Sequence, residues 1–235
     1  MDNPKILIKQ PAGIGDILFL QKLIYEIKQE TGLEILYPLK SNLMYLKDYL
    51  ESPVTFINED EEFEYKNIYS QNEIIQTPEI YYYPIQHFNH MYNTLDIMKI
   101  KYEIFGKDWN NWSDYIKINR NKEREKKLWD YLDLEGKDYI LTNKNFGTPP
   151  DSLQIDIELN TNNHIVNMDY LGWDNLFDWI KVIENANEIH TVETSICYLI
   201  ECFKLKTDKI FLYKRGNQKD FSYIEGIYKK FIKYE

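Results

Sequence analysis

Cysteine is scarce in this chain of 235 residues, which contains only Cys197 and Cys202. The two lie five residues apart in a helical pattern, so their side chains point to different faces. We therefore expect two free thiols in the core. The sequence supports neither a disulfide framework nor a cysteine-rich metal site.

Long apolar runs and an excess of positive charge are also missing. No run approaches the roughly 18 apolar residues of a membrane-spanning helix, and the N-terminal residues MDNPKILIK lack the features of a signal peptide. We therefore expect a soluble, cytoplasmic protein without a membrane span. The 28 basic residues against 38 acidic ones give a net charge of −10. That balance argues against nucleic acid as a partner, because phosphate binding needs a basic face.

A glycine-containing turn near the N-terminus is the most informative feature. Residues 6–8 form a short apolar run typical of a strand, and from Asp16 onward apolar residues recur at helical spacing. Gly13 and Gly15 lie in the turn between them. Ligands bind at the carboxyl ends of strands in open α/β sheets, so this turn lies where chemistry is expected.

Known nucleotide motifs do not fit this turn. A dinucleotide fingerprint needs a third glycine where Leu18 stands and an acidic residue closing the second strand, whereas Glu34 precedes it. No Gly-Lys-Ser/Thr follows, so a Walker loop is excluded. Two interpretations of Asp16 stay open, a helix N-cap and a functional carboxylate.

Strand and helix patterns alternate along the chain, which favours parallel sheets covered by helices. In the first half we expect strands at 33–37, 54–57, 68–69 and 80–83, and helices at 43–50 and 85–105, the latter ending at Gly106. In the second half we expect strands at 139–142, 164–168, 188–192 and 209–213, and helices at 122–134, 175–184, 196–203 and 221–234. A polar link at 107–121 separates two domains, 1–115 and 116–235.

His87 and His90 are three residues apart and share a helical face. No third ligand is spaced to complete a metal site with them. We interpret them as surface or core residues, with contact to an acceptor or a donor phosphate as the alternative.

A second informative turn lies between the 188–192 strand and the 196–203 helix. Glu193, Thr194 and Ser195 stand at the start of that helix. Unpaired N–H groups and the positive end of the helix dipole suit a diphosphate there. The alternative is an ordinary capping box that only begins the helix.

The two turns together resemble the heptosyltransferase-like glycosyltransferases of family 9, which have the two-Rossmann (GT-B) fold. Asp16 matches the catalytic base of that family, and Glu193, Thr194 and Ser195 match its D-[ST]-[GS]-x-x-H-L donor segment. The chain departs from this pattern because Glu193 replaces the usual aspartate and Tyr198 stands where histidine is common. The resemblance implies an α/β protein with two Rossmann-like parallel-sheet domains facing a cleft.

The resemblance also implies a function, the metal-independent, inverting transfer of a sugar from a nucleotide sugar to a hydroxyl acceptor on a glycan. Asp16 would accept the proton of the attacking hydroxyl. The acceptor side would further comprise Gly13, Gly15, His87 and His90. The donor side would comprise Lys144, Asn145, Gly147, Glu193, Thr194, Ser195 and Arg215. No cofactor is expected.

Two other functions stay open. A non-catalytic module on the same fold would bind a sugar, a nucleotide or a protein, and the short chain favours it. A hydrolase or phosphate-binding α/β enzyme would use Asp16 differently, but no G-x-S-x-G motif supports it. The nearest approach to the D-x-D motif of metal-dependent glycosyltransferases is Asp156-Ile157-Glu158, which we interpret as loop.

Overall fold

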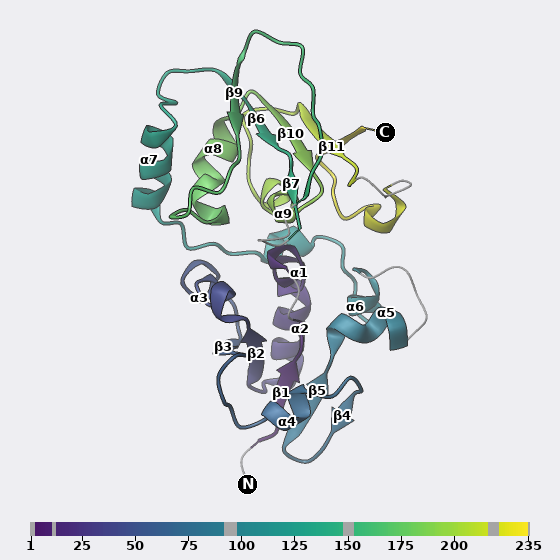
Figure 1. Cartoon of the computed structure of the whole chain (residues 1–235). Coiled ribbons are helices and arrows are strands. Elements are labelled where there is room, and N and C mark those ends of the chain that lie inside the picture. The colour runs from purple at the N-terminus through teal and green to yellow at the C-terminus, as the bar shows by residue number, and fades with distance from the viewer. Residues whose placement is uncertain (1–2, 11–12, 92–97, 148–152, 216–220, 235) are drawn as a thin grey trace. The chain divides into compact units, whose positions relative to one another are not determined.

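The computed structural model describes residues 3–10, 13–91, 98–147, 153–215 and 221–234 (Figure 1). The chain divides into two compact units, residues 1–119 (unit 1) and residues 120–235 (unit 2). The sequence had placed this division between residues 115 and 116. Each unit has its own sheet and is described separately.

Unit 1 is built on a five-stranded sheet in the order β3-β2-β1-β5-β4. Its strands are β1 (Lys5–Ile8), β2 (Ile35–Leu39), β3 (Thr55–Asn58), β4 (Ile75–Gln76) and β5 (Ile80–Tyr83). All neighbouring pairs are parallel except β4 with β5. The central strand β1 places Leu7 between Leu36 and Tyr82, and all three side chains are buried. This agrees with the apolar character of β1 and β2, because strands covered on both faces have no polar side.

The described helices of unit 1 are short apart from one. They are α1 (Ile14–Phe19), α2 (Gln21–Thr31), η1 (Ser41–Leu43), α3 (Leu46–Tyr49), α4 (Lys66–Tyr69), η2 (Ile85–His87), α5 (Phe88–Met91), α6 (Ile100–Glu103) and η3 (Trp112–Tyr115). Helix α2 ends at Gly32, whose φ of +66° makes it a left-handed C-cap. Helix α6 ends in a Schellman motif at Gly106, with the N–H of Lys107 bonded to the carbonyl of Tyr102. The sequence had predicted the helix end at Gly106.

Unit 2 contains a fully parallel sheet in the order β12-β11-β10-β6-β9 (Figure 1). Its strands are β6 (Tyr139–Asn143), β9 (His164–Asn167), β10 (Glu188–Val192), β11 (Ile210–Tyr213) and β12 (Ile232–Tyr234). A separate two-stranded sheet pairs β7 (Asn145–Phe146) antiparallel with β8 (Leu153–Gln154). The described helices are α7 (Lys122–Tyr131), η4 (Leu176–Trp179), α8 (Ile180–Asn185), α9 (Ser195–Cys202) and η5 (Ser222–Ile224). Two Rossmann-like α/β units therefore confirm the predicted fold class.

The first helix begins earlier than predicted and is interrupted. Gly13 is its N-cap, so Asp16 lies in the first turn and the N-cap interpretation of Asp16 is wrong. The interruption comes between α1 and α2, where Tyr102 Oη donates to the carbonyl of Phe19 and accepts from Leu23 N–H at 3.4 Å. In an uninterrupted helix these two backbone groups would bond to each other, so an inserted side chain separates α1 from α2.

Residues 68–69, predicted as a strand, belong to helix α4. A two-residue apolar pair carries no periodicity, and tertiary contacts decide its conformation. Tyr69 is buried in the cluster that includes Tyr82, whose hydroxyl donates to the Tyr69 carbonyl at 3.0 Å. The edge position beside β5 is taken instead by β4.

The predicted closing helix 221–234 is wrong as well. Its apolar residues have helical spacing, but Gly226 has a φ of +77° that ends any helical run. Glu201 Oε1 then accepts from the N–H groups of Lys229 and Lys230, at 2.8 and 2.9 Å. Residues 232–234 continue as β12 because the edge of β11 offers unpaired backbone groups.

Other predicted helices are present but divided. The 43–50 helix is replaced by η1 and α3, and the 175–184 helix by η4 and α8. The predicted 85–105 helix contains η2, α5 and α6, and its residues 92–97 lie outside the described residues. Within the described part of the chain, no helix is long and apolar enough to cross a membrane. Neither Cys197 nor Cys202 forms a disulfide, as predicted, but only Cys197 is buried in the core and Cys202 is half-buried.

Candidate functional site

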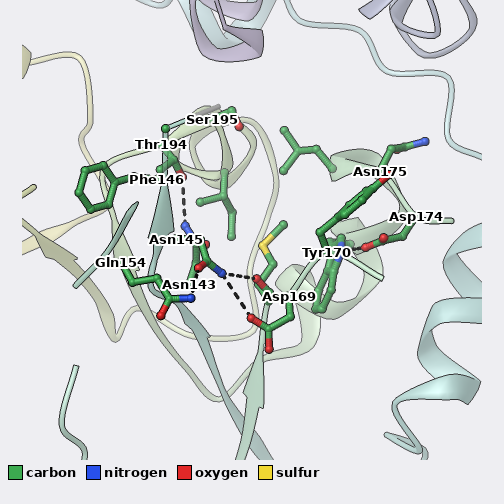
Figure 2. Close-up of a pocket in the computed structure, with 15 residues that line it drawn as sticks. Asn143, Asn145, Phe146, Gln154, Asp169, Tyr170, Asp174, Asn175, Thr194 and Ser195 are labelled. Carbon is green, nitrogen blue, oxygen red and sulfur yellow. Dashed lines mark hydrogen bonds between the residues drawn. The ribbon is translucent and has the colours of Figure 1, made fainter. Parts of the chain in front are cut away.

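A pocket of about 500 Å³ opens at the carboxyl end of the unit 2 sheet (Figure 2). Its walls come from the segments that follow β6, β9 and β10, which are neighbouring strands. The lining residues are Asn143, Asn145, Phe146, Gly147, Gln154, Met168, Asp169, Tyr170, Asp174, Asn175, Leu176, Trp179, Thr194, Ser195 and Ile196. This is the place where open parallel sheets bind ligands.

Asn143, the last residue of β6, joins two of these segments. Asn143 is 6% exposed, and its Nδ2 donates to Thr191 Oγ1 at 3.0 Å. The same Nδ2 donates to Thr194 Oγ1, also at 3.0 Å (Figure 2). The carboxamide thereby holds the end of β10 and the start of α9 against β6. Because Asn143 and Thr194 both line the pocket, this buried network sets the shape of its inner wall.

The first turn of α9 forms one side of the pocket. Thr194 is the N-cap in an extended conformation, but its side chain makes no capping hydrogen bond to the helix. The capping-box alternative for this turn is therefore wrong. A capping box is present at a different helix, η4, where Asn175 is the N-cap and Asp178 is the third helical residue. Helix α9 thus presents its N-terminal end to the pocket together with the side chains of Thr194 and Ser195.

The other side of the pocket is formed by the segment after β9. Asp174, 8% exposed, accepts from Leu171 N–H at 2.8 Å and from Trp179 Nε1 at 2.7 Å. Its carboxylate therefore fastens this segment to η4. Asp169 and Tyr170 precede it, and Figure 2 shows Tyr170 and Asp174 across the pocket from Thr194 and Ser195.

Glu193 and Arg215, both predicted to bind the donor, bond to each other. Arg215 Nη2 is 2.7 Å from Glu193 Oε2, and Arg215 Nε donates to the Glu193 carbonyl at 2.7 Å. Tyr228 Oη donates to the same carboxylate at 3.1 Å. Neither residue is among those that line the pocket. The pair lies behind the lining, with the Arg215 guanidinium 5.9 Å from the ring centre of Phe146.

Of the other residues predicted to bind the donor, some line the pocket and one does not. Asn145 and Gly147 line the pocket, and Lys144 does not. Asn145 Oδ1 accepts from Gln154 Nε2 at 2.7 Å, and its Nδ2 donates to Asp169 Oδ1 at 3.3 Å. Among the described residues that line the pocket, none is lysine or arginine.

In unit 1, Asp16 is paired with a buried cation that the sequence did not predict. Lys101 of α6 is 1% exposed, and its Nζ bonds to Asp16 Oδ1. Burial, and then the charge of Asp16, raise the pKa of Tyr37 on β2 well above its ordinary value. The Tyr37 hydroxyl is fully buried, and it has no hydrogen-bond partner among the described residues. Asp16 thus pairs with the buried Lys101 ammonium and acts electrostatically on the Tyr37 hydroxyl.

The remaining predicted residues of unit 1 are not gathered into a metal site. Gly13 has ordinary helix-entry angles and open space around it, and Gly15 is buried in α1. Burial, followed by the charges of Lys9 and His90, lowers the pKa of His87. Throughout the described ranges, no group of three or more histidine, cysteine, aspartate or glutamate residues could hold a metal ion.

Several lining residues were missed from the sequence. They are Asn143, Phe146, Gln154, Met168, Asp169, Tyr170, Asp174, Asn175, Leu176, Trp179 and Ile196. A signal existed for Asp169 and Tyr170, because both directly follow the predicted strand at 164–168 and strand ends carry ligand sites. The η4 residues had no such signal, since only folding brings them to this edge.

Comparison with known proteins gives matches for the structure and none for the sequence. No protein-family model matches the sequence, and no curated protein matches it. A glycosyl transferase family 9 structure from Veillonella parvula DSM 2008 is similar over 99% of this chain and 86% of that chain, with 9% identity and a TM-score of 0.50. This likeness confirms, for the fold alone, the family resemblance predicted from the two turns.

Two structures of one further protein match less well. The iron-containing dodecameric glycosyltransferase TibC from enterotoxigenic E. coli H10407 aligns at 9% identity and a TM-score of 0.48, over 90% of this chain and 58% of that chain. Heptosyltransferase TibC in complex with ADP-D-β-D-heptose aligns at 9% identity and a TM-score of 0.49, over 91% and 58%. The present chain spans 58% of the length of each TibC chain.

Proposed function

We propose that this protein transfers a sugar from a nucleotide sugar to a hydroxyl group of an acceptor glycan. The observation that carries the proposal is the pocket of about 500 Å³ at the carboxyl end of the unit 2 sheet, with the start of α9 on one side. Pockets of about 300–1,000 Å³ accommodate small organic ligands. The family 9 fold is consistent with this chemistry.

The nucleotide's phosphates would lie at the α9 side of the pocket. The N-terminal end of the helix carries partial positive charge and N–H donors, and the Thr194 and Ser195 hydroxyls add to them. Asp169 and Asp174 lie away from Thr194 and Ser195, so their repulsion of an anion bound at α9 is weaker there than on their own side of the pocket (Figure 2). Charge that develops on the leaving diphosphate would be stabilised at α9 without a metal ion.

Asp16 would be the general base of the transfer. Its Oδ1 is bonded to Lys101, and its side chain is 24% exposed. An exposed carboxylate edge can accept the proton of an acceptor hydroxyl as that oxygen attacks the anomeric carbon. The leaving group departs from the opposite face of the sugar, so the configuration at that carbon is inverted.

A nucleotide-binding protein without transferase activity is the second candidate. It is favoured by the pairing of two expected site charges, Arg215 with Glu193 and Asp16 with Lys101. Release of free nucleotide from a bound nucleotide sugar in the presence of candidate acceptors distinguishes the two. Transfer predicts turnover, whereas the second candidate predicts binding alone.

The proposal is tested by calorimetric titration of the protein with nucleoside diphosphates and nucleotide sugars, alongside melting curves. A ligand that binds only the folded state raises the melting temperature. Ser195→Asp is the variant of choice, because an aspartate in the first turn suits the helix but repels a bound phosphate. Asn160→Asp adds the same charge on an exposed residue that does not line the pocket.

We expect binding by the wild type and by Asn160→Asp, and loss of at least tenfold in affinity for Ser195→Asp. No binding of any nucleotide or nucleotide sugar by well-folded wild type would refute the proposed function. Equal affinities in both variants would place the phosphates elsewhere.

A further inference from the structure

Tyr170 is an aromatic side chain that the fold leaves in solvent at the rim of the unit 2 pocket. It is 76% exposed, the largest fraction among the large hydrophobic side chains that the structure describes as exposed. Its ring also contributes to the pocket lining (Figure 2). The Tyr170 hydroxyl donates to the Gly172 carbonyl at 3.4 Å, a long hydrogen bond, while most of the ring forgoes the free energy of burial.

The backbone that carries Tyr170 is held in place. Asp169 N–H donates to the Asn167 carbonyl at 3.0 Å on one side, and Leu171 N–H donates to Asp174 Oδ1 at 2.8 Å on the other. Asp174 is itself anchored to the buried Trp179 through a bond of 2.7 Å. A fixed backbone under an exposed ring lowers the cost of ordering that ring when a ligand arrives.

The surroundings of Tyr170 differ from those of the α9 side. On the α9 side Thr194 and Ser195 carry hydroxyl groups, and Phe146 beside them is half-buried, with the Arg215 guanidinium 5.9 Å from its ring centre (Figure 2). Tyr170, on the other side, has its ring mostly in solvent. Asp169, next to Tyr170, is an acceptor and disfavours phosphate. The pocket therefore has an end suited to an anion and an end with a flat aromatic group.

We propose that Tyr170 stacks on the base of the nucleotide. This inference rests on the proposed function and assigns the base to a named residue. With the phosphates at α9, the base is the part of the ligand that reaches the opposite side of the pocket. Every nucleobase has a π-face, and stacking on an aromatic side chain holds it without hydrogen bonds.

The experiment uses calorimetric titration of the full chain with ADP, GDP, CDP and UDP, and with inorganic pyrophosphate as the probe that lacks a base. Tyr170→Ala removes the ring, and Tyr170→Phe keeps it. Tyr131→Ala is the matched control, because Tyr131 is 63% exposed in the same unit but does not line the pocket. The affinity of each variant for the corresponding nucleotide sugars is measured by competition with the bound nucleoside diphosphate.

We expect Tyr170→Ala to weaken nucleoside diphosphate binding by about 5- to 150-fold, the range for loss of one stacked base. Pyrophosphate binding should be unchanged, and Tyr170→Phe and Tyr131→Ala should bind like the wild type. Unaltered nucleoside diphosphate affinity in Tyr170→Ala would overturn the inference while leaving the proposed function standing. Weakening confined to nucleotide sugars would overturn it too, by assigning the ring to the sugar. Absence of nucleotide binding in the wild type would refute both.

Discussion

Lys101 and Asp16 form an ion pair in unit 1 whose cation is almost completely withdrawn from water. The Lys101 side chain is 2% exposed, and within the described residues its recorded partners are Asp16 Oδ1 and, at 3.5 Å, Met98 Sδ. A buried ammonium is costly unless a charge of opposite sign balances it. The residue proposed as the catalytic base therefore also supports the fold, and the two roles have to be separated by experiment.

Asp16→Asn is expected to destabilise unit 1 strongly. The substitution leaves the Lys101 ammonium buried without a counter-charge, which costs about 3–5 kcal/mol. Chemical denaturation followed by circular dichroism measures the change. The control is Asp130→Asn, because the Lys126–Asp130 pair is exposed and its loss costs about 0.5 kcal/mol or less.

The double variant Asp16→Asn/Lys101→Met removes both charges and should recover most of that stability, since an apolar side chain of similar length replaces the ammonium. Because the double variant is expected to be folded, its nucleotide-sugar turnover tests the catalytic role of Asp16 separately from its role in stability. Loss of nucleotide-sugar turnover in the double variant supports Asp16 as the base. Full turnover would show that Asp16 has only the structural role.

Tyr102→Phe tests the side chain that separates α1 from α2. The ring contact with Phe19, at 5.2 Å between centroids, is preserved, but the Phe19 carbonyl and the Leu23 N–H lose their shared partner. Leaving buried backbone groups unpaired costs about 1–3 kcal/mol. We expect that loss in denaturation, together with faster hydrogen exchange at Leu23. A neutral result would mean that the two helices join and bond directly.

Arg215→Met is expected to lower the stability of unit 2 by about 1.5–3 kcal/mol, because it removes the charged partner of the buried Glu193 carboxylate and a hydrogen bond to the Glu193 carbonyl. Arg215→Lys should recover only part of this, since one ammonium cannot reproduce the two bonds that Arg215 makes to the Glu193 carboxylate and carbonyl. Lys209→Met, on an exposed residue before β11, is the control. Equal stability of the lysine variant and the wild type would contradict the two-bond geometry.

Glu201 gives a prediction with a pH dependence. Burial raises the pKa of its carboxyl above the ordinary 4.5, so the folded state binds this proton more tightly than the unfolded state does. The contribution to stability is full below pH 4.5 and is lost as the pH rises through the folded pKa. Glu201→Gln keeps an oxygen for the Lys229 and Lys230 N–H groups and carries no charge.

The stability of Glu201→Gln relative to the wild type should therefore increase as the pH rises above 4.5. Denaturation curves between pH 4 and pH 8 measure it. Glu201→Ala, which loses both bonds, should be less stable by about 1–3 kcal/mol at pH 4, where the wild-type carboxyl is protonated. A pH-independent difference between Glu201→Gln and the wild type would contradict the shift.

Much of the fold could be predicted because it depends on the local spacing of apolar residues and on the positions of glycines. The apolar strands β1, β5, β6 and β10, and the glycines that end α2 and α6, follow from periodicity and from the conformational freedom of glycine. The secondary structure was predicted wrongly where a residue distant in the sequence determines the local conformation. Tyr102 interrupts the first helix from 79 residues beyond Leu23, and Glu201 together with the edge of β11 turns a helical pattern into β12.

The candidate site divides in the same way. The sequence by itself determined the two turns that carry Asp16 and Thr194-Ser195, because a strand signal is followed directly by a helix signal at each of them. Only the tertiary structure decided which charges meet, pairing Asp16 with Lys101 and Glu193 with Arg215, and which strand ends enclose the pocket with Tyr170 at its rim. The physical reason is that burial and charge pairing depend on residues far apart in the chain. The local spacing of apolar residues carries no information about which distant residues come into contact.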